Sequence, residues 1–189
     1  MTKCENEERI IDGCRRGDRA AFQLLFEMHK DKVYSIALHF TGEEASARDI
    51  SQQVFLKLFT IIGQYRSESQ FTTWLYRVVA NACLDDQRKQ RRFVPFSHSV
   101  EVNNMVTKGS QEDTYIRRQT ADSVRTAIAG LSPKLRLPIL LKYVEDLSYD
   151  EIASVLGCSK GTVASRLNRG HKALARKLGH LRGTLVPGD

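Results

Sequence analysis

Apolar residues recur at helical spacing in two blocks of this sequence, and that period constrains the fold more than any other feature. In the first block Ile50, Val54, Leu58 and Ile62 fall at every fourth position, which places them on one stripe of a helix. No run shows the sustained alternation of apolar and polar residues that indicates a half-buried strand. We therefore predict an all-α protein.

A polar segment separates the two blocks and predicts two domains. Residues 93–119 are rich in Ser, Asn and charged side chains, and helical spacing resumes near Val124. A chain of 189 residues has room for two small cores. We therefore predict two small helical domains, 8–92 and 120–182, joined by a flexible linker.

A short helix, a tight turn and a longer helix are predicted near the end of the chain. Ser148 and Glu151 are three residues apart, the spacing at which a hydroxyl and a carboxylate each accept from a free N–H at a helix start. Gly157 suits the left-handed conformation that ends a helix, and Ser159 can cap the helix that follows. Together these signals indicate a helix-turn-helix.

The longer helix of this unit has the charge pattern of a DNA-binding helix. From Lys160 to Arg182 there are seven Lys or Arg residues and no Asp or Glu, whereas a merely solvated helix usually mixes both signs. The net charge of +7 also favours a polyanionic partner. The candidate contacts to base edges are Thr162, Ser165, Asn168 and Arg169. The candidate contacts to the DNA backbone are Lys160, Arg166, Lys172 and Arg176.

A second basic segment, Tyr65–Arg92, combines aromatic residues with a tail in which four of the last five residues are Lys or Arg. Aromatic rings stack on unpaired bases and cations follow phosphates, so this mixture suits single-stranded DNA. The alternative is that Phe71, Trp74 and Leu75 are simply core residues.

Three motifs, in this order, resemble those of the extracytoplasmic-function sigma factors of bacterial RNA polymerase. They are DISQQVFLKLF at 49–59, FTTWLYRVVANACLDDQRKQRR at 71–92 and LSYDEIASVLGCSKGTVASRL at 147–167. A helix-turn-helix alone is a weak match, but the three motifs together cover nearly the whole chain in the family's order.

The resemblance implies a DNA-binding specificity subunit of RNA polymerase and not an enzyme. The first domain would bind the coiled coil of the largest subunit of core RNA polymerase through Asp49, Gln52 and Phe55. The second domain would read the minus-thirty-five promoter element as duplex DNA, and an anti-sigma factor would hold the chain inactive. The first domain would also melt the minus-ten element, flip out a base and hold the single strand. The residues implied in that step are Tyr65, Arg66, Ser67, Glu68, Ser69, Gln70, Arg77, Asn81, Arg88, Lys89, Arg91 and Arg92.

The chain departs from the family pattern at several positions, among them Gln53, where an acidic residue is usual. The base-capture loop of the family often reads Phe-Arg-Gly-Asp-Ser, and Ser67 stands here in place of the glycine, which restricts the backbone. Many relatives carry Arg or Lys where Ala164 follows Val163, so one DNA contact is expected to be missing.

Residue spacing argues against several other classes of protein. The four cysteines are scattered and form no CxxC pair, so we expect reduced, mostly buried thiols and no metal or other cofactor. The acidic pairs Asp85–Asp86 and Glu145–Asp146 are expected to be surface acids on helices, which leaves no positioned catalytic group for a hydrolase. No apolar run approaches the roughly 18 residues that cross a bilayer, so we expect a cytoplasmic chain without membrane insertion.

A conventional helix-turn-helix regulator is the alternative function. Its C-terminal domain would look the same and bind duplex DNA as a dimer, and its N-terminal domain would sense a ligand or partner. The first domain discriminates the two, because a sensor needs neither the 49–59 helix nor a basic, aromatic segment suited to single strands.

Overall fold

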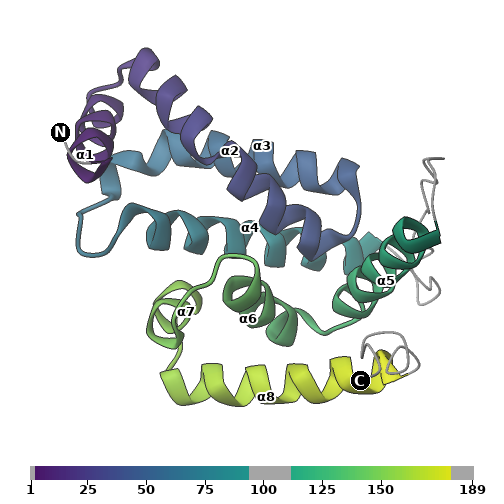
Figure 1. Ribbon diagram of the computed structural model, residues 1–189. Coiled ribbons are helices and arrows are strands. Elements are labelled where there is room, and N and C mark those ends of the chain that lie inside the picture. Colours follow the sequence, from purple (N-terminus) through teal and green to yellow (C-terminus); the bar gives the residue numbers. More distant parts are fainter. Residues whose placement is uncertain (1–2, 94–111, 180–189) are drawn as a thin grey trace.

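The computed structural model describes residues 3–93 and 112–179, and all regular structure in these ranges is helical (Figure 1). The all-α prediction is thereby confirmed. In chain order the elements are α1 (Lys3–Arg15), α2 (Arg19–Thr41), α3 (Glu44–Ile61), the short 3-10 helix η1 (Ile62–Gln64), α4 (Phe71–Phe93), α5 (Glu112–Ala129), α6 (Pro133–Tyr143), α7 (Tyr149–Leu156) and α8 (Lys160–Lys177).

The helices of the N-terminal half pack around an apolar core. Asp18 begins α2 by accepting from the backbone N–H groups of Ala20 and Ala21, at 2.8 and 3.3 Å. Gly42 ends α2 with a φ of 77°, which glycine adopts without a Cβ clash. The stripe predicted from fourfold spacing is core, because every member is at most 4% exposed: Ile50, Val54, Leu58 and Ile62.

The helix-turn-helix forms as predicted. The Ser148 hydroxyl accepts from the Glu151 N–H at 3.3 Å, and the Glu151 carboxylate accepts from the Ser148 N–H at 2.8 Å. Gly157 is left-handed with a φ of 60°. Ser159 then accepts from the Thr162 N–H at 3.2 Å and begins α8. In Figure 1, α8 runs along one edge of the molecule.

The linker predicted at 93–119 is described only at its two ends, since residues 94–111 lie outside the described ranges. Phe93 still belongs to α4, and α5 begins at Glu112. Both ends of the predicted linker are therefore helical.

A buried arginine joins the two halves of the chain. Arg136 of α6 is 7% exposed and donates to the carbonyls of Ala129, Leu131 and, across the boundary, Phe40 of α2. Its guanidinium carbon also lies 4.9 Å from the centroid of the Phe40 ring. A buried cation is costly unless its donors are satisfied, so these carbonyls fix α6 against α2. In Figure 1, α4 lies between the α2–α3 pair and the α6–α7 pair.

Candidate nucleic-acid interfaces

The helix α8 presents a basic face to solvent. Val163 and Leu167 are buried, at 0% and 1% exposure, and anchor the opposite face of the helix. The helix is therefore amphipathic. The exposed members of the predicted DNA-binding set are Lys160, Ser165, Asn168, Arg169, Lys172 and Arg176.

Two members of the predicted set lie at the edge of this face. Thr162 and Arg166 are half-buried. The Thr162 hydroxyl shares a 2.9 Å hydrogen bond with the hydroxyl of Ser159, and the Arg166 guanidinium donates to the sulfur of Cys158 at 3.7 Å. Both side chains therefore also hold the start of α8 against the turn before it.

Two exposed cations of α8 have weak local partners. Lys160 pairs with Asp150 of α7 at 2.7 Å, and Arg169 donates to the Ser165 hydroxyl at 3.2 Å. Exposed pairs of this kind contribute little to stability because water screens them. DNA phosphates or base edges can therefore replace these partners at low cost.

A glycine that the sequence analysis did not single out sets how closely α8 approaches α6. Gly170 is buried, and a Cβ added there would meet a side-chain carbon of Ile139 at 3.1 Å. The contact keeps the apolar side of α8 on the core and turns its basic side outward. The sequence signal that could have identified it is a glycine within helical spacing, at a position where no turn or helix cap requires one.

The loop between η1 and α4 exposes five of its six predicted DNA contacts. Tyr65 is the exception, because it is only 7% exposed. Its hydroxyl donates to the Ser69 carbonyl at 2.6 Å, and its ring lies 5.4 Å from the rings of both Phe71 and Trp74. Tyr65 therefore supports the loop from inside and does not present its ring to a partner. The exposed residues are Arg66, Ser67, Glu68, Ser69 and Gln70.

The backbone of this loop is left-handed at Ser67, with a φ of 57°. Ser67 stands where the family loop often has glycine, and a residue with a Cβ pays roughly 1–2 kcal/mol in this conformation. The loop thus keeps a backbone shape that glycine would adopt freely.

The helix α1 contacts the same loop through Arg15. One Nη atom of Arg15 donates to the Tyr65 carbonyl, and its guanidinium carbon lies 5.5 Å from the centroid of the Tyr65 ring. The other Nη pairs with Asp12 at 2.8 Å. Sequence reasoning missed Arg15, because 50 positions separate it from Tyr65 and no local pattern marks it.

The next predicted contacts lie on α4. Arg77 and Asn81 are exposed and one turn apart, so they share a face. Arg77 also donates to the backbone carbonyl of Ser154 in α7 at 2.7 Å. The helix-turn-helix therefore occupies one of the predicted single-strand contacts.

A second bond joins α4 to the turn between α6 and α7. The Tyr76 hydroxyl donates to the carboxylate of Glu145, and Tyr76 is only 3% exposed. Burial, more than the neighbouring carboxylate, raises the pKa of Tyr76 above its ordinary value. The prediction that Glu145 and Asp146 lie on a helix is wrong, because both lie in the turn between α6 and α7. Asp146 is a surface acid as predicted, whereas Glu145 is half-buried.

The basic end of α4 is described in part. Arg88 and Lys89 are exposed, and Arg88 pairs with Asp85 at 2.9 Å. The backbones of Arg91 and Arg92 are helical, but their side chains lie outside the described residues.

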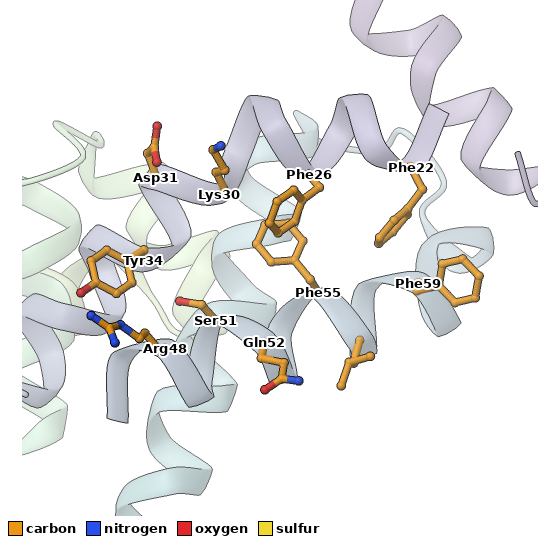
Figure 2. Close-up of a pocket in the computed structure, with 11 residues that line it drawn as sticks. Phe22, Phe26, Lys30, Asp31, Tyr34, Arg48, Ser51, Gln52, Phe55 and Phe59 are labelled. Carbon is orange, nitrogen blue, oxygen red and sulfur yellow. The ribbon is translucent and has the colours of Figure 1, made fainter. Parts of the chain in front are cut away.

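An apolar groove opens between α2 and α3, on another face of the N-terminal half (Figure 2). Phe22 and Phe26 of α2 meet Phe59 and Phe55 of α3, with ring centroids 5.1 and 4.7 Å apart. Gln52 also lines the groove, whereas Asp49 is exposed on the same helix outside the groove lining. Two large apolar side chains stay exposed at this groove, Leu56 at 63% and Phe59 at 53%.

The residues that the structure describes contain neither a metal site nor a membrane-spanning helix. No group of three His, Cys, Asp or Glu side chains there could hold a metal ion. Cys14 and Cys83 are buried, as predicted, and burial raises the pKa of both thiols, that of Cys83 to about 12. None of the described helices is long and apolar enough to span a membrane.

Two family models match the chain. The model described as Sigma-70 region 2 matches residues 25–93, and Sigma-70, region 4 matches residues 121–174. The chain is 31% identical over 179 residues to the ECF RNA polymerase sigma factor SigW of Bacillus subtilis, covering 90% of this chain and 96% of SigW. It is 30% identical over 186 residues to the RNA polymerase sigma-H factor of Pseudomonas aeruginosa, covering 94% of this chain and 96% of that factor.

Solved structures share the fold at lower identity. CnrH, solved with the cytosolic domain of CnrY, is 20% identical with a TM-score of 0.67, covering 93% of this chain and 98% of CnrH. RpoE of Bartonella quintana, solved with the anti-sigma factor NepR, is 23% identical with a TM-score of 0.66, covering 84% and 96%.

Proposed function

This chain belongs to the ECF RNA polymerase sigma factors, and from that membership we propose that two of its surfaces divide the reading of a promoter between them. As a sigma factor it binds core RNA polymerase and directs promoter-specific initiation of transcription. Sigma factors are regulators of transcription rather than enzymes. The proposal concerns which residues carry each step.

The exposed face of α8 reads the minus-thirty-five element as duplex DNA. Ser165, Asn168 and Arg169 lie on that face, on a helix whose other side is held by the core. A major groove admits such a helix, and Arg makes a bidentate contact to guanine there. Lys160, Lys172 and Arg176 hold phosphates and set the register, with half-buried Thr162 and Arg166 at the edge.

The exposed loop residues 66–70 and the α4 face with Arg77 and Asn81 hold the melted minus-ten strand. Unstacking a base costs a few kcal/mol, which a shaped pocket and nearby cations must return. Tyr65 serves this step as the support beneath the loop. Arg88, Lys89, Arg91 and Arg92 continue the basic track along α4.

The α2–α3 groove is the surface for core RNA polymerase. Gln52 and Phe55 line it and Asp49 lies on the same helix, so apolar burial and polar specificity are available together. The exposed Leu56 and Phe59 support this assignment, because large apolar side chains left in water mark a protein interface.

An anti-sigma factor controls this chain. Two proteins of similar fold were solved with partners: CnrH with the cytosolic domain of CnrY, and the sigma factor RpoE with the anti-sigma factor NepR. The same apolar groove would give such a partner a site that competes with the polymerase.

The observation that carries the proposal is the presence, in one chain, of a basic recognition face on α8 and a polar loop leading into basic α4. A conventional dimeric regulator needs only the basic face of α8. The test mixes the protein with bacterial core polymerase and a library of promoter-sized duplexes, and sequences the transcripts that depend on the added protein. We expect transcripts that start at a fixed distance from a shared two-part motif.

A groove variant provides the control for that experiment. Leu56→Asp with Phe59→Asp places charges on exposed groove positions, so it should abolish protein-dependent transcripts while duplex binding by α8 persists. If wild-type protein bound a duplex motif tightly but started no transcripts, the conventional regulator would become the better assignment.

A further inference from the structure

The loop that precedes α4 is held at both ends by one aromatic residue. Tyr65 closes the turn after η1, where its N–H donates to the Ile62 carbonyl at 3.2 Å. Its hydroxyl donates to the Ser69 carbonyl at 2.6 Å, at the far end of the loop. The Tyr65 side chain therefore spans the loop beneath its exposed residues, and moving the ring would move both ends together.

Arg15 fixes Tyr65 in turn. Its guanidinium donates to the Tyr65 carbonyl, which is the backbone acceptor where the loop begins, and lies 5.5 Å from the Tyr65 ring centroid. A charged donor makes a stronger and more directional bond to a carbonyl than a neutral one does. A cation near an aromatic ring adds an attraction that orients the ring. Arg15 therefore acts on the backbone and on the side chain of the same residue.

The loop needs an external support because its own backbone is strained. Ser67, at its centre, is left-handed with a φ of 57°. Such a conformation persists in a residue with a Cβ only where the surroundings determine it. The support comes from a separate helix, because α1 is anchored by Ile10, Ile11 and Cys14, which are at most 8% exposed.

We propose that Arg15 is a positioning residue for the minus-ten step: it holds Tyr65 so that the loop is already shaped to receive a flipped base. This inference rests on the proposed role of residues 66–70 in that step. Arg15 itself touches no DNA base in this account. It acts through Tyr65 and Ser69.

The chain offers a matched control for a test of this inference. Arg16 is the next residue, is exposed, and carries the same charge. Arg15→Ala and Arg16→Ala thus remove one cation each from the same end of α1. Arg15→Lys keeps the charge and one donor, and Tyr65→Phe removes only the hydroxyl that binds Ser69.

The experiment uses holoenzyme made with each variant and a duplex promoter recovered from the library, together with all its single-base substitutions in the minus-ten element. Arg15→Ala should lower initiation about tenfold, the size expected for one charge-assisted hydrogen bond. It should also reduce the differences in initiation rate between the original promoter and its single-base variants, which means weaker discrimination between minus-ten sequences. Arg15→Lys should recover part of the initiation rate and part of the discrimination between minus-ten sequences. Tyr65→Phe should show the same loss of discrimination, and Arg16→Ala should match wild type.

Two further readouts keep the result interpretable. Duplex binding by α8 and affinity for core polymerase should be unchanged in Arg15→Ala, which shows that the chain is folded. Gln70→Ala, an exposed loop variant, tests the loop itself. If Gln70→Ala changes minus-ten discrimination and Arg15→Ala does not, the positioning role is refuted and the loop assignment stands. If neither variant changes it, the loop assignment fails, and the positioning role fails with it.

Discussion

The face of α8 and the loop before α4 are both proposed to contact DNA, yet the chain builds them in different ways. The α8 face is one regular helix whose exposed cations have only screened local partners, such as Lys160 with Asp150. The loop depends on distant elements: Arg15 of α1 holds Tyr65. Its neighbouring contact on α4, Arg77, is bonded to Ser154 of α7.

The α8 face is a ready surface, because its exposed cations have only weak local partners. The α4 face is partly occupied, because Arg77 already bonds to α7. On α8, duplex DNA has to replace only screened local partners, such as Asp150 at Lys160. On the proposed assignment of Arg77, the single strand must instead displace the Arg77–Ser154 bond, and the minus-ten face then competes with the helix-turn-helix of its own chain. Binding to α8 and binding to α4 should therefore respond differently when contacts between the two halves are cut.

The largest expected effect is that of Arg136→Ala, which removes the side chain that joins the halves. Three carbonyls lose a buried donor, so the free energy of unfolding should fall by about 3 kcal/mol. Denaturant titration measures the loss. Arg125→Ala removes an exposed pair with Asp122 and should cost less than about 0.5 kcal/mol. Equal costs for both variants would mean that Arg136 does not secure the contact between the halves.

The second effect concerns the ready surface. Arg169→Ala should weaken binding of the preferred minus-thirty-five duplex by about 2 kcal/mol, because a base contact carries sequence preference. Arg176→Ala, on the same exposed face, should weaken binding to all duplexes alike. Competition titrations with preferred and scrambled duplexes measure both. A uniform loss for Arg169→Ala would reassign it as a phosphate contact.

The third effect concerns the occupied surface. Tyr76→Phe keeps the buried ring but removes its bond to Glu145, so unfolding should become easier by about 1 kcal/mol. The same change releases the turn before α7 from α4, which loosens α7 there, and it should strengthen binding of a single-stranded minus-ten oligonucleotide to the free protein. Unaltered oligonucleotide binding would argue that α7 does not restrict α4.

The raised pKa of Tyr76 adds a pH signature to this variant. The folded protein keeps the phenol proton above the ordinary pKa of 10.0, whereas the unfolded chain releases it there. The stabilisation is therefore complete below pH 10 and declines as the pH rises beyond it. Unfolding free energies between pH 9 and 11, measured roughly half a unit apart, should fall less steeply in Tyr76→Phe than in wild type.

The smallest expected effect is that of Ser67→Gly. Glycine relieves the left-handed strain but adds freedom to the unfolded chain, so the net gain in stability should be about 0.5 kcal/mol or less. Ser69→Gly, at a loop position without a positive φ, should instead destabilise. Thermal unfolding of both variants gives the comparison. A loss of stability in Ser67→Gly would show that the strain at this position is negligible.

The same contrast explains what could be predicted from the sequence. The helix-turn-helix was predictable because its signals are local. Ser148 and Glu151 are three positions apart, and Gly157 ends the short helix that they begin. The basic character of α8 was predictable for the same reason, because its cations lie within one helix. The burial of the Ile50–Ile62 stripe also needed only periodicity.

The loop could not be predicted in the same way, because its structure depends on residues far away in the chain. Arg15 lies 50 positions from Tyr65, and Arg77 lies 77 positions from Ser154. Sequence spacing carries no record of such contacts, and the family resemblance, which implies a DNA contact for Tyr65, does not reveal that its ring is buried. Ser67 was identified as a departure from the family loop, but its left-handed φ needed the structure.

The division of promoter reading is tested most directly by repeating the promoter-library selection with two variant holoenzymes, Arg169→Ala and Gln70→Ala. We expect Arg169→Ala to lose sequence preference in the upstream element alone and to keep the minus-ten preference of wild type. We expect the reverse for Gln70→Ala. Loss of preference in the same element with both variants would contradict the assignment of two separate reading surfaces.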